Sequence, residues 1–186
     1  MAAAEQGKFK RFAGWLWRTP FARMVHFAVL LFALSMLARA LGVALEIPSN
    51  SLRTMEANLA STVLIVLPYV LAYWALARLI EHRKVDELSW RKSPQLLWGL
   101  LCALALFVLL TAQLWAAGVY RITGYGDAPV WILFLLTAVA PGIVEEIVSR
   151  GILFRLTEEG LGTWIALAVS ALFFGFMHVF NPGATV

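Results

Sequence analysis

The sequence predicts an all-α fold, specifically a polytopic bundle of membrane-spanning helices. Hydrophobic residues make up 61% of its 186 residues and charged residues only 14%, whereas soluble domains hold about 45–50% apolar and about 25% charged residues. The apolar residues also gather into five long runs, each near the roughly 20 residues that a membrane-spanning helix needs. This composition excludes a soluble fold and also a disordered chain, which requires low hydrophobicity and high charge.

Five transmembrane helices are therefore predicted, one after another along the chain. They cover about residues 24–45, 57–77, 96–120, 128–144 and 161–177. Each is expected to be a helix, because an isolated strand would leave its backbone polar groups without hydrogen bonds in lipid. The sequence lacks the strand-like alternation of a membrane barrel. Its single cysteine, Cys102, excludes disulfides and cysteine-cluster metal sites.

The basic residues between the runs predict the orientation of the bundle. Twelve of the 15 Lys and Arg residues lie before the first span, between the second and third, or after the fourth. By the positive-inside rule these segments face the cytoplasm, so the N-terminus is expected to be cytoplasmic and the chain to end outside. The net charge of +4 therefore indicates a membrane surface as the partner, and no nucleic acid.

Two regions of the chain are expected. Residues 1–23 are a basic interfacial N-terminal segment, which is either an amphipathic helix on the cytoplasmic face or a leader that only sets the topology. Residues 24–186 form the membrane domain. The candidate functional residues of that domain lie within 141–182.

Four residues at the ends of the last two spans are the candidate catalytic residues: Glu145, Glu146, Arg150 and His178. A charge inside a membrane costs at least about 2.5–3.5 kcal/mol, so an intramembrane charge indicates a functional site. Glu146 and Arg150 are four residues apart and predict an ion pair on one helical face. Glu145 points about 100° away without a local partner, which makes it the candidate general base. Phe174, four residues before His178, is expected to pack beneath the imidazole.

Helix lengths predict whether Glu145 and His178 can meet. The connection between the two helices is expected near Glu158 to Gly162. With the turn taken at Gly160, Glu145 lies 15 residues before it and His178 lies 18 after it. At 1.5 Å per residue these are about 22 Å and about 27 Å, so an antiparallel hairpin brings the two side chains within about one helical turn of the same depth. The residues alone leave an alternative open. In it, the two glutamates end the fourth helix among the headgroups and His178 lies at the outer interface.

Two motifs in this region resemble those of a known family. Glu145-Glu146-Ile-Val-Ser-Arg150 matches E-E-x-x-x-R, and Phe174-Gly-Phe-Met-His178 matches F-x-x-x-H, of the CAAX protease and bacteriocin-processing (CPBP, or Abi) membrane peptidases. The resemblance implies a membrane-embedded, metalloendopeptidase-like protease. It would hydrolyse peptide bonds of membrane-associated or prenylated, CAAX-like substrates. It would be a multi-pass integral membrane protein, located in the inner or plasma membrane if the host is a bacterium.

The resemblance also implies a role for each residue. Glu145 would activate the attacking water, with support from Glu146 and Arg150. His178 would bind a metal or polarise the carbonyl oxygen. Glu145 and His178 are thus the candidate ligands of a Zn²⁺ ion, with a metal-free glutamate mechanism as the alternative.

One departure from the family pattern affects this site. A catalytic zinc usually has three protein ligands, and Glu145 and His178 supply at most two. The H-x-x-x-N motif that the family carries on a later helix does not occur before Val186. We therefore expect either a chain that is truncated at its C-terminus or an incomplete site.

The rival prediction, from another class, is a non-catalytic polytopic membrane protein, such as a scaffold or a bacteriocin-immunity-like factor, with a degenerate site. Both predictions expect the lipid bilayer as a partner. Only the peptidase also expects a peptide or prenylated-protein substrate. The two predictions differ in whether exchanging Glu145 for glutamine changes peptide cleavage.

Overall fold

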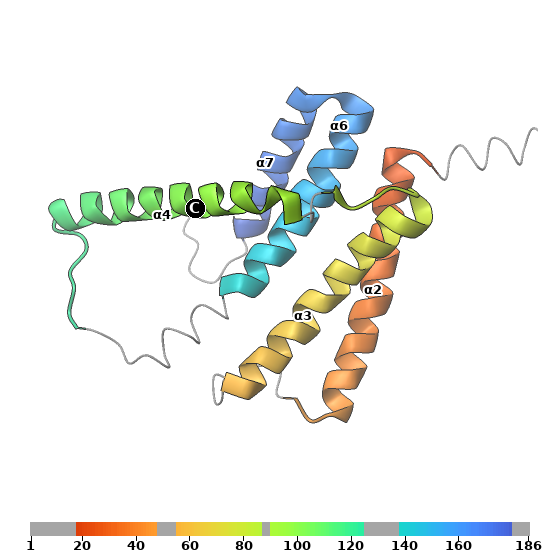
Figure 1. Cartoon of the computed structure of the whole chain (residues 1–186), viewed down its shortest axis with the longest axis horizontal. Helices are drawn as coiled ribbons and strands as arrows, with labels where there is room; N and C mark the ends of the chain where they lie inside the picture. The colour runs from red at the N-terminus through yellow and green to blue at the C-terminus, as the bar shows by residue number, and fades with distance from the viewer. Residues whose placement is uncertain (1–17, 48–54, 87–89, 125–137, 180–186) are drawn as a thin grey trace, which may run out of the picture. The chain divides into compact units, whose positions relative to one another are not determined.

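Figure 1 shows a computed structural model of the chain, which describes residues 18–47, 55–86, 90–124 and 138–179. All regular elements in these ranges are helices, so the predicted all-α class, a membrane helical bundle, is confirmed. The chain divides into two compact units. The first contains Met1–Arg83 and Ile132–Val186, and the second contains Lys84–Trp131.

The N-terminal half of the first unit is a pair of long helices, α2 (Pro20–Ala44) and α3 (Met55–Ala75). Thr19 caps the start of α2, because its Oγ1 accepts a hydrogen bond from Ala22 N at 3.3 Å and a proline follows at the first helical position. α3 continues into a π-helical turn, η1 (Leu76–Ile80). The two helices lie side by side (Figure 1) and match the first two predicted spans.

The C-terminal half of the first unit is one long helix followed by a shorter one. Residues 138–146 are α-helical and continue directly into a π-helix, η4 (Ile147–Phe154), and then into α6 (Arg155–Leu161). α7 (Thr163–Val179) runs back beside η4 and α6 (Figure 1). The end of the predicted fourth span and the fifth span thus form a helical hairpin. Residues 128–137, where the fourth span is predicted to begin, lie outside the described residues.

The second unit contains a short 3₁₀ turn, η3 (Trp90–Lys92), and the long helix α4 (Ser93–Ala116). None of the α4 residues is buried. The Thr111 hydroxyl donates a hydrogen bond to Phe107 O at 2.8 Å and is therefore satisfied within the helix. A helix that is apolar on all sides is typical of a membrane span, so α4 matches the third predicted span.

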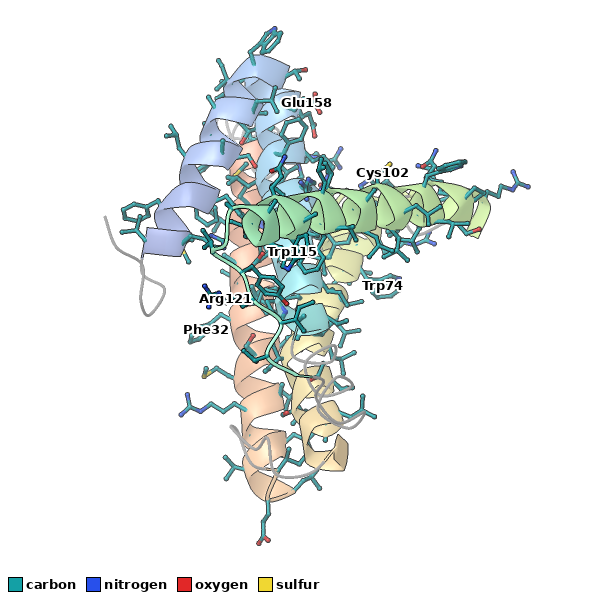
Figure 2. The ribbon with its side chains drawn as sticks, turned by 90° about the vertical axis from the view of Figure 1, so that its left-hand side faces the viewer. Phe32, Trp74, Cys102, Trp115, Arg121 and Glu158 are labelled. Carbon is teal, nitrogen blue, oxygen red and sulfur yellow. The ribbon has the colours of Figure 1, made fainter. Side chains whose placement is uncertain are left out.

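Three helices in the described part of the chain are long and apolar enough to cross a membrane: Pro20–Ala44, Leu59–Ile80 and Ser93–Ala116. They correspond to the first three predicted spans. Thr163–Val179 is a shorter apolar helix of 17 residues at the place of the fifth. Figure 2 shows Phe32 on α2 and Trp74 on α3 pointing outward, where they are 66% and 50% exposed. Such exposed apolar side chains are typical of a surface that contacts lipid.

The packed core of the first unit includes the end of α3, the start of η1 and the start of α6. Ala72, Leu76 and Ala77 are fully buried, and so is Leu156. α3 contacts η4, and α2 contacts α6. Small residues let membrane helices approach closely, so that van der Waals contacts stabilise their interface.

Five charged side chains meet at one end of the first unit and are here called the Glu81 cluster: Arg23, Glu81, Arg83, Arg155 and Glu159. Glu81 Oε1 accepts hydrogen bonds from Arg23 Nη1 at 3.1 Å and from Arg155 Nη2 at 3.0 Å. Glu81 Oε2 accepts one from Arg83 Nε at 2.7 Å. Arg23 also pairs with Glu159. The cluster therefore links α2 and the residues after η1 to α6.

The central carboxylate of the cluster is almost fully buried, since the Glu81 side chain is only 3% exposed. Burial raises the pKa of Glu81, but the hydrogen bonds and charges of Arg83 and Arg155 outweigh burial and hold that pKa below its usual value of 4.5. The topology prediction places Arg23, Arg83 and Arg155 on one side of the membrane, and the structure brings them together. That this side is the cytoplasm stays a prediction.

Replacing Glu81 with glutamine should destabilise the protein. Removing one charge from a buried ion-pair network costs about 3–5 kcal/mol, because the remaining charges lose their partner. We therefore expect the Glu81→Gln variant in detergent micelles to unfold at a lower temperature than the wild type. Glu46→Gln is the matched control, since Glu46 is exposed. An equal loss of stability in both variants would contradict the role of Glu81.

The stabilisation by Glu81 should also depend on pH. Because the folded-state pKa of Glu81 lies below its usual value of 4.5, its contribution is complete at neutral pH and is lost as the pH falls through that folded-state pKa. The three arginines keep their charge, and Glu159 is the other carboxylate that faces the cluster. In thermal unfolding, the difference between wild type and Glu81→Gln should shrink as the pH falls below the usual carboxyl pKa of 4.5 and through the lower folded-state pKa. A difference that stays constant from neutral to acid pH would contradict the assignment.

Candidate functional site

The first motif spans the junction between an α-helix and a π-helix. Glu145 and Glu146 close the α-helical stretch 138–146, and Arg150 lies in the middle of η4. The helix does not end at the glutamates, because it continues through η4 and α6 to Leu161. The alternative is therefore wrong in expecting the helix to end at the glutamates, whereas the depth of the glutamates in the membrane stays a prediction. π-Helical turns are rare in proteins and are frequent at functional sites.

The two motif helices are joined at Gly162, at the end of the expected connection. Gly162 has φ +86°, which costs glycine nothing sterically, and its N–H donates to Glu158 O at 2.9 Å. The Thr163 hydroxyl donates to Glu158 Oε1 at 2.8 Å at the start of α7. Gly160 and Gly162 could each permit a turn, but these hydrogen bonds to Glu158 form with the turn at Gly162. The turn thus lies within the expected connection, Glu158 to Gly162, and two residues after the Gly160 that served to calculate the depths.

The observed turn changes the predicted depth of the two motifs. Glu145 lies 17 residues before Gly162, and His178 lies 16 residues after it. Along ideal helices these lengths are about 26 Å and about 24 Å. The two residues are therefore closer to the same level than a turn at Gly160 would place them.

A pocket of about 430 Å³ lies between η4 and α7. Its walls contain an ion pair, two serine hydroxyls and several apolar side chains. The lining residues are Glu146, Ser149, Arg150 and Phe154 on one side, and Leu167, Ser170, Ala171 and Phe174 on the other. The pocket thus contains residues of both motifs.

Glu146 and Arg150 form the ion pair that their spacing predicts. Arg150 Nη1 donates to Glu146 Oε1 across one helical turn. The Arg150 side chain is 72% exposed, and the Glu146 side chain is 58% exposed. Since protein atoms cover little of this pair, it is open to a ligand or to water at the edge of the pocket.

His178 is oriented by Phe174, one helical turn before it. The two ring centroids are 4.3 Å apart, so the predicted packing of Phe174 against the imidazole is confirmed. His178 Nδ1 lies 2.8 Å from Phe174 O. A carbonyl oxygen can only accept, so Nδ1 carries the hydrogen, and in the neutral ring the lone pair is on Nε2. Nε2 is therefore the nitrogen that is available to a proton or a metal.

Glu145 and His178 are not among the residues that line the pocket. Glu145 is half-buried, and His178 is exposed. Within residues 18–47, 55–86, 90–124 and 138–179, no three His, Cys, Asp or Glu residues gather in a way that could hold a metal. The described residues thus do not supply the three protein ligands of a catalytic zinc. Zn²⁺ stays a prediction, with Glu145 and His178 as its candidate ligands.

The C-terminal part of the chain matches a known protein family. Residues 127–186 match the model described as Rce1-like, type II CAAX prenyl endopeptidase Rce1-like. This segment is therefore similar to CAAX proteases of the CPBP type and is here called the CAAX-protease segment. The CAAX-protease segment contains both motifs and all of η4, α6 and α7, and it covers about a third of the chain. No curated protein and no solved structure matches the chain.

Sequence reasoning missed several residues around the CAAX-protease segment. Ser149 and Ser170 line the pocket, although neither is charged nor at a defining position of the two motifs. Glu81 contacts Arg155 of this segment from a region that the family match does not cover. One signal for Glu81 was available, because it is an acidic residue at the end of an apolar run and close to Arg78 and Arg83.

The pocket should control how fast a cysteine at position 149 reacts with a thiol reagent. Ser149 lines the pocket and is 8% exposed, and Ala171 lies in the opposite wall. In a Cys102→Ser background, a Ser149→Cys variant should react with N-ethylmaleimide, and adding Ala171→Phe should slow the reaction severalfold by filling the pocket. Leu172→Phe is the control, since Leu172 is 74% exposed and lies outside the pocket lining. Equal slowing by both phenylalanines would contradict the pocket.

Proposed function

We propose that this protein is an intramembrane endopeptidase of the CPBP type. It hydrolyses peptide bonds of membrane-associated or prenylated, CAAX-like substrates. The observation that supports this best is that residues of both motifs line one pocket between facing helices within the CAAX-protease segment. The apolar length of three helices supports a site inside the membrane.

The polar residues around the pocket can bring water to the reaction. Polar groups at membrane depth line water-filled cavities or pair with one another. The Glu146–Arg150 pair does both, because it satisfies its own charges and stays open at the pocket edge. The serine hydroxyls of the two walls add donors and acceptors. The apolar residues of the walls suit the hydrophobic side chains of a membrane-associated peptide.

Glu145 is the proposed general base. Its carboxylate takes a proton from water as the water oxygen bonds to the scissile carbonyl carbon. When the C–N bond of the tetrahedral intermediate breaks, the same carboxyl group returns the proton to the leaving amine. Glu146, held by Arg150, keeps a fixed negative charge next to the base. The step as written uses only Glu145 and water.

His178 is proposed to stabilise the oxyanion through Nε2. With Nδ1 committed to Phe174 O, only Nε2 can face the substrate. The protonated imidazole would donate from Nε2 to the oxyanion, which is the kind of preorganised contact that contributes most to acyl-transfer catalysis. The neutral ring would instead offer a lone pair to a metal ion. A catalysed reaction that resists metal chelators would support the oxyanion role.

The direct test of this function is the Glu145→Gln variant of the full-length protein in proteoliposomes. Loss of the general base should lower turnover of a prenylated C-terminal peptide by about 10²–10⁴-fold. The control is Glu158→Gln in the same hairpin, because Glu158 lies at the Gly162 turn and outside the pocket lining. Equal turnover of wild type and Glu145→Gln would remove Glu145 as the base. Absence of any cleavage by the wild type would favour the non-catalytic rival.

A further inference from the structure

On the side that faces α3, the π-helix η4 is held by a closed ring of contacts. Arg155 Nε donates to Gly151 O at 2.8 Å, and Arg155 Nη2 donates to Glu81 Oε1 at 3.0 Å. On the other oxygen, Glu81 Oε2 accepts from Arg83 Nε at 2.7 Å. Arg83 Nη2 donates to Tyr73 OH at 2.9 Å, and its guanidinium lies 5.6 Å from the centre of the Tyr73 ring.

The ring closes because the Tyr73 side chain lies directly against Gly151. A Cβ at Gly151 would be 3.1 Å from Tyr73 Cε2, which is closer than most side-chain contacts allow. Tyr73 is 8% exposed and Ile152, next to Gly151, is 5% exposed. One face of η4 is thus packed closely on α3.

The opposite face of η4 belongs to the pocket. Ser149 and Arg150 immediately precede Gly151, and both line the pocket with Glu146. Glu145 is on the last α-helical turn before η4. Any rotation of η4 about its axis would therefore move the pocket residues and the proposed base together.

We propose that Tyr73 and Arg155 are positioning residues, which set the rotation of η4 and thereby the direction of the pocket face and of Glu145. The geometry of Arg155 fits this role, because its planar guanidinium holds a backbone carbonyl of η4 and the buried Glu81 in one fixed arrangement. Lysine carries the same charge but lacks the planar guanidinium group that holds both acceptors in this arrangement. The consequence for catalysis rests on the proposed function, whereas the consequence for the orientation of η4 does not.

Arg23 offers a matched control within the same cluster. It binds Glu81 and Glu159, as Arg155 binds Glu81, and its side chain is 11% exposed compared with 24% for Arg155. None of its ion pairs involves η4 or Tyr73. Arg23→Lys should thus lower stability without rotating η4, which separates positioning from a purely structural role.

The experiment measures the reactivity of Ser149→Cys in the full-length protein with Cys102→Ser, because Cys102 is exposed on α4 and would otherwise react (Figure 2). Arg155→Lys and Tyr73→Phe should each change the rate of N-ethylmaleimide modification severalfold, and Arg23→Lys should leave it unchanged. Tyr73→Phe keeps the ring that packs on Gly151, so it retains the fold even if Arg155→Lys does not. Unchanged reactivity in Tyr73→Phe and in any folded Arg155→Lys protein would overturn the proposal.

Kinetics give the second readout. Without the Cys102 and Ser149 substitutions, Arg155→Lys and Tyr73→Phe should lower kcat by about tenfold or more with little change in KM, since small misplacements of a base cost this much. Arg23→Lys should keep the wild-type kcat. If all variants and the wild type lack cleavage, the proposed function fails, yet the thiol rates still decide whether these residues position η4. An equal loss of kcat in Arg23→Lys and Tyr73→Phe would contradict positioning.

Discussion

The first unit depends on a single buried carboxylate. Glu81 is 3% exposed and binds arginines from three separate segments of the chain. A charge buried to this degree is tolerated only with partners in place, so helices that move apart would leave it unpaired at a cost of several kcal/mol. Van der Waals packing of membrane helices lacks this directionality. The Glu81 cluster therefore selects one arrangement of α2, α3 and α6 from the many that apolar contacts would permit.

The consequence for the site comes through Arg155. This residue belongs to the helix that carries the first motif, and it connects Glu81 to a carbonyl of η4. The face of η4 opposite Gly151 lines the pocket with α7. The Glu81 cluster and the pocket of the hairpin are thus parts of one continuous structure. A purely apolar contact in place of Glu81 would hold the helices together but would not fix the rotation of η4.

Features set by local sequence were predictable. The first three of the five predicted spans follow from hydropathy, because the thickness of the bilayer dictates how long an apolar helix must be. The Glu146–Arg150 pair and the Phe174–His178 contact follow from a spacing of four residues on a helix. The resemblance of the two motifs to the CPBP family is confirmed by the match of residues 127–186.

Features set by long-range contacts were not predictable. The Glu81 cluster joins residues 58 to 136 positions apart in the sequence, and no periodicity reveals such pairs. The eight residues of η4 are too few for a hydrophobic pattern to distinguish a π-helix from an α-helix. The choice of Gly162 over Gly160 depends on hydrogen bonds to Glu158, which sequence alone does not rank. The roles of Glu145, Glu146, Arg150 and His178 stay proposals.

The central claim is that η4 is held so that its motif face and α7 enclose one pocket. The most direct measurement is cross-linking between Ser149→Cys and Ser170→Cys, one from each wall, in the Cys102→Ser protein in membranes. A bifunctional maleimide that spans about 8–10 Å, the usual separation of packed helix axes, should join them efficiently. The control pair combines Ser149→Cys with Leu172→Cys, which lies outside the pocket lining. Efficient cross-linking of the first pair alone is the predicted result, and equal or better cross-linking of the control pair would contradict the account.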